Sequence, residues 1–261
     1  TQNQSSAASD VYKRQAKGEI VDGDLSDNNL SSGHFSRLLK KVKEGNYQGL
    51  LIRLNTPGGS GFASEIIRQE LIQLKDLEIP IIVSMADIAA SGGYWISADV
   101  DEIWASPFTL TGSIGVWTAL PDFGKSLKDI GINYDGVSTT QFNPSLVTGP
   151  DDNSKLLIQS VVDSAYEYFL EVVSKGRNLD KDFTKTISEG KIWTSKEAKE
   201  NGLIDEIGSQ RNSLDHLAQL AKLEDYDVEL IEVEVNFLQQ INLYLSNFFP
   251  ITFSNLINQN L

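Results

Sequence analysis

Two short, unbroken apolar runs with one helical pattern between them constrain the fold more than any other feature. Residues 49–55 read GLLIRLN and residues 79–85 read IPIIVSM. Apolar runs without polar alternation are typical of strands that are buried on both faces of a parallel sheet. Between the runs, a loop, TPGGSG, leads into a helical pattern over residues 62–77. The sequence therefore predicts a βαβ unit, and with it an α/β fold whose mostly parallel buried sheet is flanked by helices.

The same patterns predict three parts of the chain. Residues 1–15 are polar, rich in Ser and Gln, and without period, so we expect a disordered or non-native leader outside the fold. Residues 16–222 alternate strand and helix patterns, with helices expected over 34–43, 151–175 and 211–222. Another helix is expected to start at Thr194, where Glu197 stands at capping-box spacing, and to stop at Gly202. Residues 223–261 carry apolar side chains at helical spacing before Pro250, which predicts a C-terminal helical extension. Its apolar stripe would pack on the body, on another subunit or on a membrane.

Composition excludes several function classes. The chain has 22 basic and 36 acidic residues, a net charge of −14, so we expect no nucleic-acid partner. It has no cysteine, which excludes disulfides, thiolate metal sites and a cysteine nucleophile, and we expect no cofactor. No apolar stretch has the roughly 18 residues of a membrane span, so the chain as given is expected to be soluble.

Ser91 is the candidate nucleophile. It stands among small residues in AASGGYW, directly after the apolar run that ends at Met85. A serine on a strand-to-helix turn is exposed, and the N–H of the next residue, Gly92, can join an oxyanion pocket. The alternative is that Ser91 is simply the N-cap of the following helix. The glycine loop at Gly58 and Gly59 also has more than one interpretation. It is an oxyanion-binding loop, an ordinary tight turn or a phosphate-binding loop.

A base that activates Ser91 is harder to find. The two histidines, His34 and His216, fall in polar helical patterns and are expected to be solvated surface residues. A buried, neutral lysine is the remaining kind of activator. The nearest downstream lysines lie in acidic helical stretches where a charged surface lysine is the default: Lys125, Lys128 and Lys155.

Four motifs in order, LIRLNTPGG, ASGGYWIS, ASPFTLTGSIGV and KIWTSKEAKENGLIDEIG, resemble the signal peptide peptidase A (protease IV) family of bacteria over residues 16–222. The resemblance implies a ClpP/crotonase-like fold and a serine protease with a Ser-Lys dyad. It also implies a membrane-anchored homo-oligomer at the periplasmic face of the inner membrane. Its peptide substrates would be cleaved signal peptides and other membrane-associated peptides.

Carried over by position, the resemblance assigns Ser91 as the nucleophile and the backbone amides of Gly59 and Gly92 as the oxyanion hole. The family's lysine has no counterpart: the matching segment, residues 138–142, reads STTQF. Double-length members supply the lysine from a first copy and the serine from a second. The chain is therefore expected to be a C-terminal half, with the lysine in a missing N-terminal half or a neighbouring subunit and the membrane anchor also missing.

A bound peptide is expected to add as an extended strand beside the loop after Gly59, with a shallow pocket for a small or apolar residue. The candidate residues for its lining are Tyr94, Trp95 and Leu110. Two other functions stay open. One is a crotonase-like acyl-CoA enzyme with basic residues in a CoA pocket. The other is a non-catalytic oligomerisation or scaffold subunit, which the missing lysine suggests.

Overall fold

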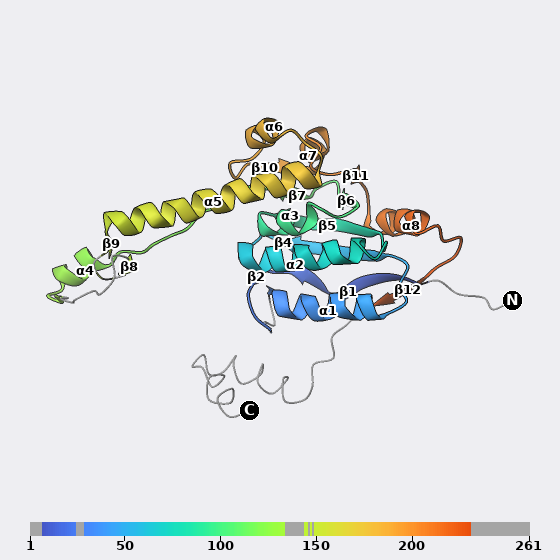
Figure 1. Cartoon of the computed structure of the whole chain (residues 1–261), viewed down its shortest axis with the longest axis horizontal. Helices are drawn as coiled ribbons and strands as arrows, with labels where there is room; N and C mark the ends of the chain where they lie inside the picture. The colour runs from blue at the N-terminus through green and yellow to red at the C-terminus, as the bar shows by residue number, and fades with distance from the viewer. Residues whose placement is uncertain (1–6, 25–28, 134–143, 146, 148, 231–261) are drawn as a thin grey trace, which may run out of the picture.

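The computed structural model describes residues 7–24, 29–133, 144, 145, 147 and 149–230. A sheet of eight strands runs through the molecule (Figure 1), in the order β10-β7-β5-β4-β1-β12, with β6 attached to β5 and β11 to β6. Neighbouring strands are parallel except β10 and β7, which are antiparallel. The strands are β1 (Ala7–Lys17), β4 (Leu50–Thr56), β5 (Ile81–Ala90), β6 (Glu102–Ala105), β7 (Leu110–Gly112), β10 (Ile192–Thr194), β11 (Glu206–Ile207) and β12 (Asp227–Leu230).

Helices and two small strand pairs complete the described fold. The pairs are β2 (Ile20–Val21) with β3 (Leu30–Ser31), and β8 (Pro144–Ser145) with β9 (Gly149–Pro150). The helices are α1 (Ser32–Glu44), α2 (Gly61–Lys75), α3 (Gly92–Ser97), α4 (Gly124–Asp129), α5 (Asp152–Gly176), α6 (Lys181–Thr186), α7 (Ser195–Glu200) and α8 (Gln210–Leu220).

The central strands are buried on both faces, as their apolar runs predict. Leu50, Ile52 and Leu54 of β4 face the main core, which α1, α2, α3 and α5 complete. Leu51 belongs to a second cluster with Leu217 of α8. Alternate residues of one strand thus enter two separate cores. The prediction of an α/β fold with a mostly parallel, helix-flanked sheet is confirmed.

The N-terminal segment differs from its expectation. Residues 7–15 belong to β1, which pairs in parallel with β4 on one side and β12 on the other. The expectation that residues 1–15 lie outside the fold is therefore wrong for residues 7–15. The physical reason is that the free N–H and C=O groups along an edge of β4 pair with any extended backbone, whatever its side chains.

The C-terminal segment also begins differently. Asp227–Leu230 is the strand β12, so the expected helical extension over residues 223–261 is wrong at its start. The apolar stripe of the extension falls in residues 231–261, outside the described residues.

Only one half of α5 packs on the body. Phe169 and Val173, in its C-terminal half, are buried. Leu156, Leu157 and Val161, which the sequence pattern places on the same packed face, are 71%, 49% and 61% exposed. Figure 1 shows this first half of α5 extending away from the sheet, with α4 at its tip. A helical period predicts an apolar face but does not say what covers it.

Hydrogen bonds that converge on Glu65 join α2, α3 and α5. Its carboxylate accepts from Arg68 Nε at 2.8 Å, Trp95 Nε1 at 2.7 Å and the Tyr168 hydroxyl at 2.9 Å. Arg68 also pairs with Asp99, which follows α3. Burial by itself would raise the pKa of Glu65, but the hydrogen bonds it accepts outweigh burial and lower the pKa from 4.5 to about 2.

Arg68→Met is expected to lower the free energy of unfolding by about 3 kcal/mol, because it leaves two half-buried carboxylates without their cation. Chemical denaturation measures this. The control is Lys40→Met, which removes an ion pair with Glu44 whose side chains are 71% and 68% exposed and should change stability little. Equal effects of the two substitutions would contradict the structural role of Arg68.

Glu65 also predicts a loss of stability in acid. A carboxyl whose pKa is lower in the folded state stabilises the fold above its unfolded pKa, and this contribution disappears as pH falls through the folded value. For Glu65 the loss should occur between pH 4.5 and about 2. As pH is lowered across this window, the denaturation midpoint should fall less steeply for Glu65→Gln than for the unchanged chain. Identical dependence of the midpoint on pH in the two proteins would show that Glu65 has no such role.

Candidate active site

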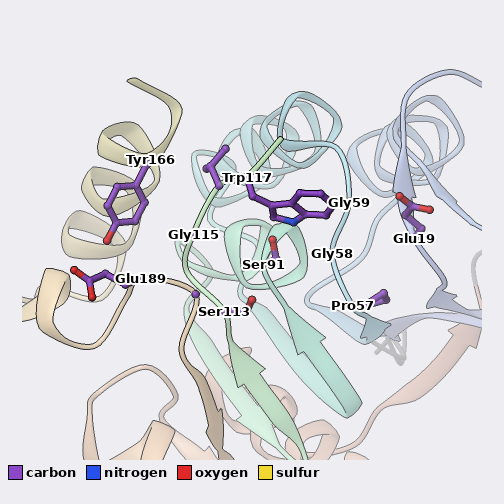
Figure 2. A pocket seen from close by; sticks show the side chains of 12 residues that line it. Glu19, Pro57, Gly58, Gly59, Ser91, Ser113, Gly115, Trp117, Tyr166 and Glu189 are labelled. Atoms are coloured by element: carbon purple, nitrogen blue, oxygen red, sulfur yellow. The ribbon is translucent and has the colours of Figure 1, made fainter. Parts of the chain in front are cut away.

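Ser91 occupies the turn between β5 and α3 in a conformation that few non-glycine residues adopt. Its φ is 52° and its ψ −119°. The Ser91 N–H donates to the Gly112 carbonyl at 2.9 Å, and its own carbonyl accepts from the Trp95 N–H at 2.9 Å. The Ser91 side chain makes no capping hydrogen bond. The capping interpretation therefore does not hold for the hydroxyl, which faces a pocket instead (Figure 2).

The glycine loop between β4 and α2 lies against Ser91. Gly58 has a φ of 110°, and a Cβ built on it would come within 2.7 Å of Ser91 Cβ and 2.9 Å of the Gly92 nitrogen. Gly59 has a φ of 148°, and a Cβ there would meet the Ile20 carbonyl oxygen at 2.2 Å. Glycine is required at both positions because no side chain fits between the loop and its neighbours.

The backbone amides of Gly59 and Gly92 come close to each other beside Ser91. A Cβ built on Gly92 would lie 3.4 Å from the Gly59 nitrogen. The flanking backbone is fixed, because the Ile20 N–H donates to the Gly58 carbonyl and the Ser60 N–H donates to the Ile20 carbonyl, both at 2.8 Å. Within the described part of the chain, neither the Gly59 nor the Gly92 N–H donates to a protein acceptor. Both are therefore available to a ligand.

These groups surround an open pocket of about 720 Å³ (Figure 2). Its lining contains two serine hydroxyls and two carboxylates but no lysine, arginine or histidine. The lining residues are Glu19, Pro57, Gly58, Gly59, Ser91, Ser113, Gly115, Val116, Trp117, Tyr166, Glu189 and Gly190.

Sequence reasoning missed four polar members of this lining: Glu19, Ser113, Tyr166 and Glu189. Ser113 and Glu189 have positive φ values of 49° and 59°, which no local sequence pattern announces. Ser113 comes directly after β7, which ends at Gly112. Tyr94 and Trp95, our guesses for the lining, are buried in the core, and Leu110 does not line the pocket either.

None of the candidate lysines approaches Ser91. Lys125 and Lys128 are exposed on α4, at the tip that α5 carries away from the sheet (Figure 1). Lys155 pairs with Asp152 at 3.1 Å near the start of α5. The segment 138–142, where the resemblance would place a lysine, lies outside the described residues.

The histidines do not approach Ser91 either. His216 is half-buried, where we expected a solvated residue, because it packs on Trp104 with ring centroids 5.4 Å apart and its Nε2 lies 2.9 Å from Glu102 Oε1. His34 lies on α1 and does not line the pocket. Neither forms a triad with Ser91.

A family model and several curated proteins match most of this chain. The model of "Peptidase family S49" matches residues 73–224. Protease 4 of Haemophilus influenzae is 41% identical over 221 residues, which cover 82% of this chain and 36% of that protein. Protease 4 of Salmonella typhi is 33% identical over 87% of this chain and 37% of its own length. A putative signal peptide peptidase SppA of Enterococcus faecium is 36% identical over 84% of this chain and 65% of its own length. The chain thus spans little more than a third of the two Protease 4 relatives.

Solved structures show the same fold at low sequence identity. The 1510-N membrane-bound stomatin-specific protease, in a mutant form with a substrate peptide, superposes with a TM-score of 0.52 at 17% identity, covering 93% of this chain and 99% of that one. ClpP1 of Listeria monocytogenes gives a TM-score of 0.50 at 13% identity, covering 80% of this chain and 93% of its own. The ClpP-like fold predicted from the motifs is confirmed.

Gly58→Ala is expected to lower the free energy of unfolding by about 2 kcal/mol or more, because alanine is strained at positive φ and its methyl group collides with Ser91. Gly61→Ala is the matched control. A Cβ at Gly61 meets no atom within 4 Å, and alanine favours the helix that begins there, so stability should be unchanged or slightly higher. Chemical denaturation of both variants measures the difference; equal stability would contradict the close approach of the loop.

Proposed function

Because the chain belongs to peptidase family S49, we propose that it is the serine-bearing part of a serine endopeptidase that degrades cleaved signal peptides and other membrane-associated peptides. The observation that carries the proposal is the position of Ser91. Its hydroxyl faces an open pocket from a strained turn, beside two glycine amides without protein acceptors. We assign this role to the domain of residues 16–222. Strands β1 and β12 extend the central sheet of this domain.

The proposed reaction uses these groups in order. Ser91 Oγ attacks the carbonyl carbon of the scissile peptide bond, and its proton passes to a neutral lysine. The Gly59 and Gly92 N–H groups donate to the oxygen that becomes negative in the tetrahedral intermediate. The lysine then returns the proton to the leaving amine, which leaves an acyl-enzyme. Water hydrolyses this ester by the same path and frees Ser91.

The lysine is proposed to come from a missing N-terminal half or from a neighbouring subunit. Two observations support this. No lysine lines the pocket in the part of the chain that the structure covers, and the chain spans 36% and 37% of the Protease 4 relatives. Serine without a base is a poor nucleophile, so the chain alone should be a weak enzyme.

Assembly into a homo-oligomer is part of the proposal, and its support is the exposed half of α5. Leu156, Leu157 and Val161 leave an apolar face on a helix that projects from the body, and such a face is stabilised when another chain covers it. We place the full-length protein at the periplasmic face of the bacterial inner membrane, held by an anchor outside this sequence. Among the described residues, no helix is long and apolar enough to cross a membrane.

The two alternative functions fare differently. An acyl-CoA enzyme would need basic groups for the CoA phosphates, but the charged residues that line the pocket are Glu19 and Glu189. We therefore set this alternative aside. A non-catalytic scaffold subunit is favoured by the lack of a base in the pocket lining, and the following experiment separates it from the protease.

A fluorogenic signal-peptide mimic should be hydrolysed by this chain mixed with a lysine-bearing N-terminal half, and only weakly by the chain alone. Ser91→Ala should lower the rate of the mixture by about 10³-fold or more, because it removes the nucleophile. Ser164→Ala is the matched control, since that hydroxyl is exposed on α5 and bonds only the Ser160 carbonyl of its own helix.

No hydrolysis in any mixture, with folding and assembly verified, would support the scaffold alternative. Full activity of the chain alone would place the base within this sequence and contradict the proposed division. Hydrolysis that survives Ser91→Ala would remove Ser91 from the mechanism.

A further inference from the structure

The pocket around Ser91 is acidic on both sides. Glu19 and Glu189 lie on opposite sides of Ser91 (Figure 2), and no cationic residue belongs to the lining. Across the described ranges, neither carboxylate takes part in an ion pair. By contrast, Glu171 on α5 pairs with Lys175 at 2.7 Å. The pocket therefore holds negative charge that no ion pair among the described residues neutralises, and it favours a cationic ligand.

Glu189 is held in a fixed position at one side of the pocket. Its φ of 59° lies in the left-handed region, which is uncommon for a residue with a long side chain. The next residue, Gly190, donates its N–H to the Ile114 carbonyl at 3.0 Å, and the preceding Ser188 donates its hydroxyl to the Thr184 carbonyl at 2.6 Å. These bonds anchor the turn, so the Glu189 side chain starts from a constrained backbone at the rim of the pocket.

The Tyr166 hydroxyl lies in the same part of the lining. It is buried and has no hydrogen-bond partner among the described residues. Burial is the main reason that the pKa of this hydroxyl is raised, and the negative charge of Glu189 raises it further. The nearby Glu189 backbone lowers the pKa by a smaller amount, although its position does not meet the geometry of a hydrogen bond. The phenol is therefore neutral at physiological pH. A buried polar atom without a partner is unfavourable, and a ligand that donates to its oxygen would satisfy it.

Trp117 adds an aromatic surface. Its side chain lines the pocket and is 83% exposed, and its ring stands above Ser91 in Figure 2. In that view the ring lies toward Gly59 and away from Glu189 and Tyr166, so it belongs to another part of the pocket.

We propose that the Glu189 wall, defined as Glu189 and Tyr166, is a subsite that binds a lysine or arginine side chain of the peptide substrate. The cationic end pairs with the Glu189 carboxylate and donates to the Tyr166 hydroxyl. This inference rests on the proposed function, since it assigns a specificity to the same site. It adds a basic side chain to the small or apolar residue expected next to the cleaved bond.

The general-base lysine is the other possible source of such a cation, and the chemistry disfavours it here. A carboxylate next to an ammonium group raises its pKa and keeps it charged, whereas a base must be neutral to accept a proton. A substrate cation gains from the same carboxylate without that conflict.

Binding to the full Ser91→Ala chain tests the subsite without requiring cleavage. A labelled apolar decapeptide is prepared with one lysine at each position in turn, and a matched series carries norleucine, which has a similar stem without the charge. Fluorescence anisotropy should show that lysine at one position binds about five- to tenfold tighter than norleucine. Glu189→Gln should abolish most of this preference, and added salt should weaken it. Glu171→Gln, an exposed carboxylate outside the pocket, should leave the preference unchanged.

The inference would be overturned by equal binding of lysine and norleucine peptides at every position, by no measurable binding of any lysine peptide, or by a lysine preference that survives Glu189→Gln. Loss of the preference when a lysine-bearing N-terminal half is added would show that the base occupies this wall, and would also overturn it. Failure of the proposed function is a separate result, because a peptide that binds with lysine preference but is never cleaved by the complete mixture leaves the subsite in place.

Discussion

The hydrogen bonds that converge on Glu65 hold together the two helices on which the site depends. α2 begins directly after the glycine loop, and α3 begins directly after Ser91. The bond from Trp95 Nε1 to Glu65, at 2.7 Å, sets the distance between these helices, and Arg68 neutralises the carboxylate that receives it. Because the Gly59 and Gly92 amides lie at the starts of these helices, a change in helix spacing would separate the two proposed oxyanion donors.

The sequence predicts the central part of the fold well. The runs around Leu51 and Ile82 place apolar side chains in two cores, one on each face of the sheet. The capping box expected at Thr194 is present, with Glu197 bonded back to the Thr194 N–H at 3.0 Å. These features depend on residues close in sequence, so composition and spacing are enough to find them.

Other features depend on contacts between distant segments. β1 has no strand pattern of its own and is placed by the free edge of β4. Within the site, the candidate nucleophile Ser91 could be singled out because a serine among small residues after a strand is a local pattern. Tyr166 and Glu189 are far from Ser91 in sequence and meet it only through the packing of α5 and the Ile114–Gly190 hydrogen bond. The exposed half of α5 shows a different limit of sequence reasoning. Its apolar stripe is visible in the sequence, but the same stripe can pack in a core or remain exposed on the surface of the chain.

The charged residues around Ser91 determine which ligands the pocket favours. Among the described residues, the pocket is lined by two carboxylates and by no lysine, arginine or histidine, so it favours a ligand that carries positive charge. The central claim is that Ser91 is the nucleophile. Its most direct test is to treat the chain, mixed with a lysine-bearing N-terminal half, with a fluorophosphonate and to map the modified residue by peptide mass spectrometry. The account predicts loss of fluoride and a phosphonyl group on Ser91 alone; modification elsewhere, or equal modification of Ser91 and exposed serines such as Ser164, would contradict it.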